Sequence, residues 1–160
     1  MRLIVAAVGR LKVGAERALF EKYRDRLQAA GKPLGITPIT WHEVLESPAH
    51  AAAKRRAEEG AALLKAARHA DVVIALDAKG KMLTSHAFAQ LIGAIRDEGA
   101  KTLGLLIGGA DGLAPEIASR TRANVSFGAI TLPHQLARIV LAEQLYRAAT
   151  ILAGHPYHRD

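Results

Sequence analysis

Two patterns of hydrophobic and polar residues alternate along the chain: short, continuously apolar runs and longer stretches with apolar residues at helical spacing. The first apolar run, Arg2–Gly9, is rich in aliphatic residues and ends in glycine, which is typical of a buried strand. Residues 15–30 follow with apolar positions that recur every three to four residues. The chain therefore opens with a strand followed by a helix.

The same alternation continues to the C-terminus. We expect further strands at 34–44, 71–77, 103–107 and 125–130, a turn at Gly80, and helices at 47–69, 84–97, just after Pro115 and from about Thr131 to Gly154. Ser47 and Thr131 are candidate helix caps, each followed closely by a proline suited to a first turn, and either Thr84 or Ser85 caps the helix between them.

Apolar strands separated by long helices indicate an α/β fold with a parallel sheet covered by helices on both faces. We find no linker or repeat, and expect residues 1–160 to form a single domain. Ligands of such sheets bind outside the carboxyl ends of the strands. The places to look are therefore Leu76-Asp77, Gly108-Gly109 and Gly128–Ile130.

Composition narrows the class of protein. Half of the 160 residues are hydrophobic, enough for a buried core, and the absence of cysteine excludes disulfides, thiolate metal sites and cysteine nucleophiles. The apolar run Leu3–Val8 is too short for a signal peptide or a membrane span. We therefore expect a cytoplasmic protein that does not enter a membrane.

The charge of the chain favours a polyanionic partner. Lys and Arg number 22 against 15 Asp and Glu, for a net charge of +7, so nucleic acid is the leading partner and an anionic membrane surface the alternative. Three Phe, three Tyr and one Trp are too few for a platform that stacks single strands. The basic run Lys54–Arg56 is best interpreted as a solvated helix face, with RNA contact as the alternative.

Three glycines within Gly108–Gly112 follow a predicted buried strand and would let the backbone approach a ligand closely. The segment matches neither a dinucleotide fingerprint nor a P-loop. A tight strand-to-helix turn without a ligand is the alternative explanation.

The last helix and the tail after it carry the remaining candidate chemistry. The apolar face of the helix is wider than one core contact needs, which predicts a subunit interface. His134 lies in its first turn, where the positive helix end favours a neutral imidazole able to act as a base; a local polar contact is the alternative. His155 and His158 are spaced for metal binding but lack a third ligand, so we expect no metal.

Three segments together resemble a known family: LDAKGKMLTSHAFA from Leu76, LLIGGADGL from Leu105 and GAITLPHQLARIVLAEQLYRAATILAGHPYHR from Gly128. They are similar to the bacterial ribosomal RNA methyltransferases that modify N3 of a pseudouridine in helix 69 of the large subunit, which are minimal SPOUT-class enzymes. The resemblance implies a C-terminal trefoil knot, a homodimer with its site at the interface, and 23S rRNA within the ribosome as substrate.

The resemblance also implies S-adenosyl-L-methionine as cofactor, held by backbone groups. The matching positions are Leu76, Gly108, Gly109, Gly128, Ala129, Ile130, Thr131, Leu132 and Pro133. Methyl transfer to an imide nitrogen needs positioning, loss of a proton and stabilisation of negative charge, but no metal.

We assign catalytic roles to three residues on this basis. Arg159 would face the developing charge or a neighbouring phosphate, Tyr157 would stack on or hydrogen-bond to the base, and His134 would orient the base or remove its proton. His155 and His158 are candidates for substrate contact. Two alternatives stay open: a SPOUT methyltransferase acting on tRNA, and a non-catalytic ribosome-associated RNA-binding protein. The lack of an added RNA-binding domain argues for a large preformed substrate.

Overall fold

The computed structural model describes residues 1–157 and contains a five-stranded sheet in the order β2-β1-β4-β3-β5. All neighbouring strands are parallel. The strands are β1 (Arg2–Val8), β2 (Ile39–Val44), β3 (Val72–Met82), β4 (Thr102–Ile107) and β5 (Ala123–Ser126). The predicted parallel α/β sheet is confirmed.

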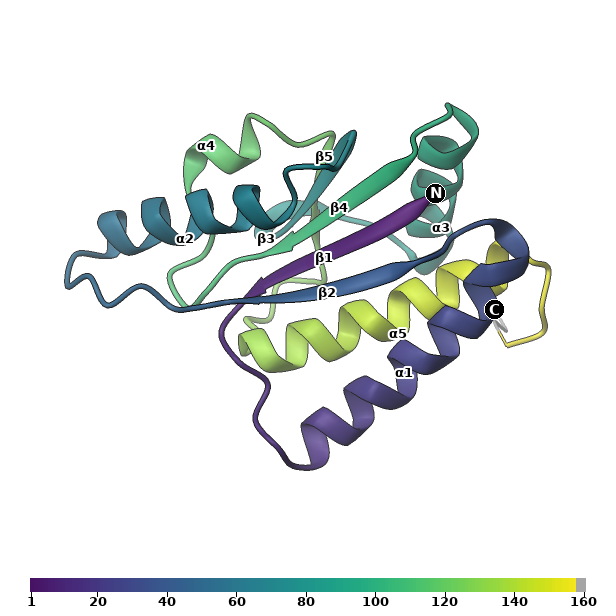
Figure 1. The fold of residues 1–160 in the computed structure, drawn as a ribbon, viewed down its shortest axis with the longest axis horizontal. Helices are drawn as coiled ribbons and strands as arrows, with labels where there is room; N and C mark the ends of the chain where they lie inside the picture. The colour runs from purple at the N-terminus through teal and green to yellow at the C-terminus, as the bar shows by residue number, and fades with distance from the viewer. Residues whose placement is uncertain (158–160) are drawn as a thin grey trace.

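Helices cover both faces of this sheet (Figure 1). They are α1 (Ala15–Gly31), α2 (Ala52–Ala66), α3 (Ser85–Asp97), α4 (Pro115–Ala118) and α5 (His134–Leu152), with a 3-10 turn, η1, at Lys32–Leu34. On one face Leu27, Ile92 and Leu141 of α1, α3 and α5 pack on the strands. On the other, Leu63 and Ile117 of α2 and α4 do so. Each face of the sheet thus has its own core.

Two predicted boundaries are wrong because long-range contacts override local signals. The strand expected from residue 34 begins only at Ile39, after η1. The helix expected from Ser47 begins only at Ala52, after an extended Ala51 (φ −79°, ψ 126°), and the backbone N–H of Ser47 donates to the Glu59 carboxylate at 3.0 Å. Pro48 consequently lies in a connecting loop.

The turn expected at Gly80 is also wrong, since β3 runs on to Met82 with an irregularity after Leu76 in its pairing with β5. A Cβ at Gly80 would lie 2.7 Å from the backbone of Asn124, so this glycine permits close contact with β5. The Thr84 cap is confirmed, because its side chain accepts a hydrogen bond from Ala87 N–H at 3.1 Å.

The last strand and helix also differ from the expectation at their junction. β5 ends at Ser126, and α5 begins at His134 with Pro133 as the capping residue, so Thr131 does not cap it. The helix ends at Leu152 and Gly154 follows in a left-handed conformation, as expected. The trefoil knot stays a prediction. Among the helices of residues 1–157, none has the length and apolarity to span a bilayer.

Candidate functional site

The predicted ligand-binding segments lie together where the pairing of β3 with β4 ends and its pairing with β5 becomes irregular. Leu76 of β3 pairs with Ile107 of β4 on one side and with Val125 of β5 on the other. Gly108 directly follows Ile107, and Gly128 lies three residues after Val125. The segments that the sequence marks as ligand-binding therefore share one edge of the sheet.

The turn after β4 is tightly closed and has no room for side chains at its glycines. Gly112 N–H donates to the carbonyl oxygen of Gly109 at 3.0 Å. A Cβ at Gly108 would lie 2.9 Å from the backbone of Gly112, and one at Gly109 would lie 2.7 Å from Oε2 of Glu59. Glu59, which sequence reasoning missed, is 6% exposed, and its Oε2 has no hydrogen-bond partner among the described residues.

An ion pair fastens this turn to α2. Arg55 donates to both carboxylate oxygens of Asp111, at 2.6 and 3.1 Å, and also to the carbonyl oxygens of Ala49 and His50. The hydrogen bond from Arg55 lowers the pKa of Asp111, and the same bond raises the pKa of Arg55. The interpretation of Lys54–Arg56 as a purely solvated face is wrong for Arg55.

The segment between β5 and α5 combines a glycine in an unusual conformation with exposed apolar side chains. Gly128 has φ 127°, and its N–H donates to Ser126 Oγ at 3.2 Å. Open space lies beside it, where a Cβ would meet nothing within 4 Å. Ile130, two residues on, is 82% exposed. Open space beside Gly128 and an exposed apolar side chain therefore face solvent after the end of β5.

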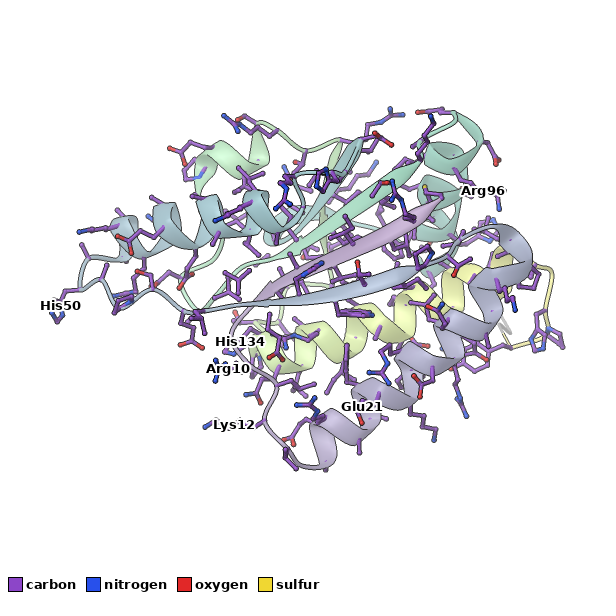
Figure 2. All side chains as sticks on the ribbon, in the orientation of Figure 1. Arg10, Lys12, Glu21, His50, Arg96 and His134 are labelled. Atoms are coloured by element: carbon purple, nitrogen blue, oxygen red, sulfur yellow. The ribbon has the colours of Figure 1, made fainter. Side chains whose placement is uncertain are left out.

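His134, the first residue of α5, lies at the same edge beside the ends of β1 and β2. Its Nε2 is 3.8 Å from Oε1 of Glu46, and its ring packs so closely on Gly9 that a Cβ there would lie 2.7 Å from Nε2. A hollow opens beside it, lined by Gly9, Arg10, Lys12, Leu45, Glu46, His134 and Gln135. Figure 2 shows His134, Arg10 and Lys12 gathered at this end of the molecule.

The predicted tail residues lie at the other end of α5. This helix has 19 residues and is therefore about 28 Å long. Tyr157 packs on Tyr146 with ring centroids 4.6 Å apart, and its hydroxyl lies 3.4 Å from Oε1 of Glu143. Burial, with help from that carboxylate, raises the pKa of Tyr157.

Within one chain, the structure does not bring Tyr157 and His134 together. His155 is exposed near Tyr157, and its Nδ1 accepts a hydrogen bond from the Tyr157 N–H at 3.2 Å. Arg159 and His158 lie outside the described residues. No group of three or more His, Asp or Glu residues within 1–157 is arranged to hold a metal ion.

Comparison with known families accounts for this arrangement. The family model SPOUT_MTase, described as "Predicted SPOUT methyltransferase", matches residues 1–158. The chain belongs to the SPOUT methyltransferase family. The resemblance to SPOUT methyltransferases drawn from the sequence is thereby confirmed.

Curated relatives of this SPOUT methyltransferase match it over nearly their whole length. Proteins named "Ribosomal RNA large subunit methyltransferase H" from Xanthobacter autotrophicus and Nitrobacter winogradskyi are each 54% identical over 159 residues, which is 99% of this chain and 99% of theirs. A solved structure, a probable methylase family protein from Haemophilus influenzae, matches with a TM-score of 0.51 at 14% identity, covering 99% of this chain and 70% of that one. The latter likeness concerns the fold alone.

The SPOUT strand ends are chemically suited to a small organic cofactor. Gly108, Gly109 and Gly128 offer backbone groups without side chains, and the space beside Gly128 is open. Ile130, which is 82% exposed, adds apolar surface after the end of β5. A planar, hydrogen-bonding group such as a purine ring fits this combination of apolar contact and backbone polarity.

Proposed function

We propose that this protein is an S-adenosyl-L-methionine-dependent methyltransferase of large-subunit ribosomal RNA. We further propose that it methylates N3 of a pseudouridine in helix 69, that it acts on assembled cytoplasmic ribosomes, and that it works as a homodimer. The observation that carries this proposal is the meeting of Leu76, Gly108 and Gly128 at one sheet edge with His134 nearby. Family membership and the names of the 54% identical relatives support it.

The cofactor would be held by Leu76, Gly108, Gly109 and the backbone of Gly128–Pro133. When bound, it supplies a methyl group activated on a sulfonium. The closed turn fixed by Arg55 and Asp111 keeps the position of Gly109 constant, so less conformational entropy is lost on binding. Exposed Ile130 would become covered at the same time, which excludes water from the transfer.

In the transfer itself, a bond forms between the methyl carbon and N3 of the base while the carbon–sulfur bond breaks, and the N3 proton must leave. An unprotonated His134 can accept that proton on Nε2, with the carboxylate of Glu46 at 3.8 Å to stabilise the resulting imidazolium. Arg159 is proposed to balance negative charge on the carbonyl oxygens of the base. Tyr157 is proposed to contact the base, and His155 and His158 to contact the surrounding RNA.

The length of α5 supports the proposed homodimer. Because His134 and Tyr157 lie at opposite ends of this helix, the tail of a second copy must complete the site if both residues act on one base. Leu19 of α1 and Leu136 of α5 each keep 43% of their surface exposed, which leaves apolar area for such a contact. Sedimentation at micromolar concentration should give twice the mass of one chain, and a monomer would contradict this part of the proposal.

Transfer of labelled methyl groups to RNA tests the activity. Ribosomes that lack the modification should be methylated, whereas tRNA and protein-free rRNA should be poor acceptors, and mass spectrometry of the digested rRNA should place the label on one pseudouridine. Preferred labelling of tRNA would favour a tRNA-directed SPOUT enzyme. A chain that binds ribosomes but shows no heat on titration with S-adenosyl-L-methionine would instead be a binding protein without this activity.

A further inference from the structure

The loop between β1 and α1, residues 9–14, carries two cations that the proposed mechanism does not use. Arg10 and Lys12 are exposed, and within residues 1–157 their side chains make no hydrogen bond or ion pair. Both line the hollow that also contains His134 (Figure 2). Unpaired positive charge is therefore concentrated beside the candidate catalytic histidine.

The loop is held in place by buried polar contacts on both sides of Arg10. The guanidinium of Arg138, 2% exposed, donates to the carbonyl oxygens of Gly9 at 2.8 Å and Val8 at 3.3 Å. Glu43 accepts from the N–H of Leu11 at 2.9 Å and from Arg138 at 3.0 Å. The backbone is thus fixed immediately before and after Arg10. Arg10 therefore loses less conformational entropy when it binds a ligand than a residue of a mobile loop would.

The register of the sheet places this loop next to the proposed cofactor segments. Ala7 of β1 pairs with Ile107 of β4, so the residues that follow Ala7 run alongside Gly108. A Cβ at Gly109 would lie 3.1 Å from Val8 Cγ1, which confirms how close the two strand ends are. A base that meets His134 would therefore have its sugar-phosphate backbone near the loop.

We propose that Arg10 and Lys12 bind the RNA phosphates that flank the methylated nucleotide. This inference rests on the proposed function, since it names the part of the substrate that the loop recognises. Arginine can contact a phosphate with two donors and lysine with a point charge, and neither group has a competing partner among residues 1–157. The Glu46 carboxylate lines the hollow near His134 and would repel phosphates. The phosphates would therefore pass on the Arg10 and Lys12 side of the hollow.

The test compares two double variants that remove the same charge. Arg10→Ala with Lys12→Ala removes the loop cations. Arg96→Ala with Lys101→Ala removes two cations elsewhere: Figure 2 shows Arg96 at the opposite end of the molecule, and Lys101 precedes β4 at the amino edge of the sheet. Within the part of the chain that the structure describes, the Arg96 side chain pairs with its exposed neighbour Asp97 at 2.8 Å and with no other residue, so the control removes little structure.

Binding to unmodified ribosomes is measured over a series of salt concentrations, alongside cofactor titration. We expect the loop variant to bind about tenfold more weakly, with a salt dependence reduced by about two counterions, and to keep wild-type cofactor affinity. The control pair should bind as the wild type does. Arg10→Lys with Lys12→Arg should restore most of the affinity, because the charge is retained.

Unchanged ribosome affinity in the loop variant would overturn the loop proposal without touching the proposed function. An equal loss of affinity in the control pair would do the same. A parallel loss of cofactor affinity would also overturn it, since the cations would then serve the cofactor carboxylate. If the wild-type chain neither binds nor methylates ribosomes, the proposed function fails as well. Thermal unfolding of both variants is used to check that each one is folded.

Discussion

Arg138 of α5 and Gly9 at the end of β1 are joined by a 2.8 Å hydrogen bond across 129 positions of sequence. The guanidinium is buried, and this desolvation lowers the pKa of Arg138, with partial compensation from the carboxylate of Glu43. A buried cation that binds two carbonyl oxygens and a carboxylate ties the first strand to the last helix. The position of His134, four residues before Arg138, depends on these hydrogen bonds.

Replacing Arg138 with leucine should destabilise the protein by about 2–4 kcal/mol, because the carbonyl oxygens of Val8 and Gly9 lose this donor and the Glu43 carboxylate loses its cationic partner. Chemical denaturation measures the loss. Arg17→Leu is a suitable comparison, since Arg17 pairs with Glu21 on an exposed face and should cost less than about 1 kcal/mol. Equal losses in the two variants would contradict a structural role for Arg138.

Gly9→Ala should reduce methyl transfer by more than its loss of folding stability can explain. The new Cβ would lie 2.7 Å from Nε2 of His134, so the imidazole must move, and φ of 89° adds backbone strain. Gly35→Ala provides the matched control, because Gly35 also has a positive φ, 68°, but nothing within 4 Å of its Cβ position. Both should lose about 1–2 kcal/mol of stability. A Gly9 variant with wild-type turnover would show that the His134 position is unimportant.

Asp111→Asn should weaken cofactor binding several-fold, because the Gly108–Gly112 turn loses its attachment to Arg55. The pKa of Asp111 is lowered in the folded state, so the stabilisation from this pair is present above the ordinary aspartate pKa. It is lost as the pH falls below that value through the folded pKa.

Calorimetric titration at neutral pH measures the change in cofactor affinity. As the pH falls below the ordinary aspartate pKa, the Asn variant should lose less stability than the wild type does. Asp25→Asn removes a carboxylate that pairs with its neighbour Arg24 on α1 and should leave cofactor affinity unchanged. Equal cofactor affinity in wild type and Asp111→Asn would refute the role given to the pair.

Mixing two inactive variants tests whether two copies share a site. His134→Ala and Arg159→Ala should each lose most turnover, but a heterodimer has one site in which both residues are intact. Random exchange of subunits should therefore restore about a quarter of wild-type activity. Cofactor affinity of Arg159→Ala should stay normal. No recovery after verified subunit exchange would place both residues in the same chain's site or remove one of them from the reaction.

Much of the fold could be predicted from sequence because its signals are local. Continuous apolar strands such as Leu103–Ile107 mark a parallel sheet wherever they occur, and the positions after them mark its ligand edge. The strand-end segments at Leu76, Gly108 and Gly128 were found in this way, and the sheet register does bring them together.

What sequence reasoning missed depends on partners far apart in the chain. Asp111 lies 56 positions from Arg55, and Arg138 lies 95 positions from Glu43, so no spacing rule links them. The contact of Ser47, where a helix start was wrongly predicted, is of the same kind, because its N–H donates to Glu59, 12 positions away. The separation of His134 from Tyr157 became visible only once α5 had a defined length and direction.

The packing of the final helix on the first has a consequence for biosynthesis. Leu27 of α1 and Leu141 of α5 belong to one apolar cluster, and the neighbouring strands β1 and β4 are almost a hundred residues apart in order of translation. Contacts of such high sequence separation form late and slowly. A chain whose α5 has not yet been made therefore lacks part of the apolar layer on the side of the sheet that α1 and α3 also cover, so this core is completed only after the last helix has been synthesised.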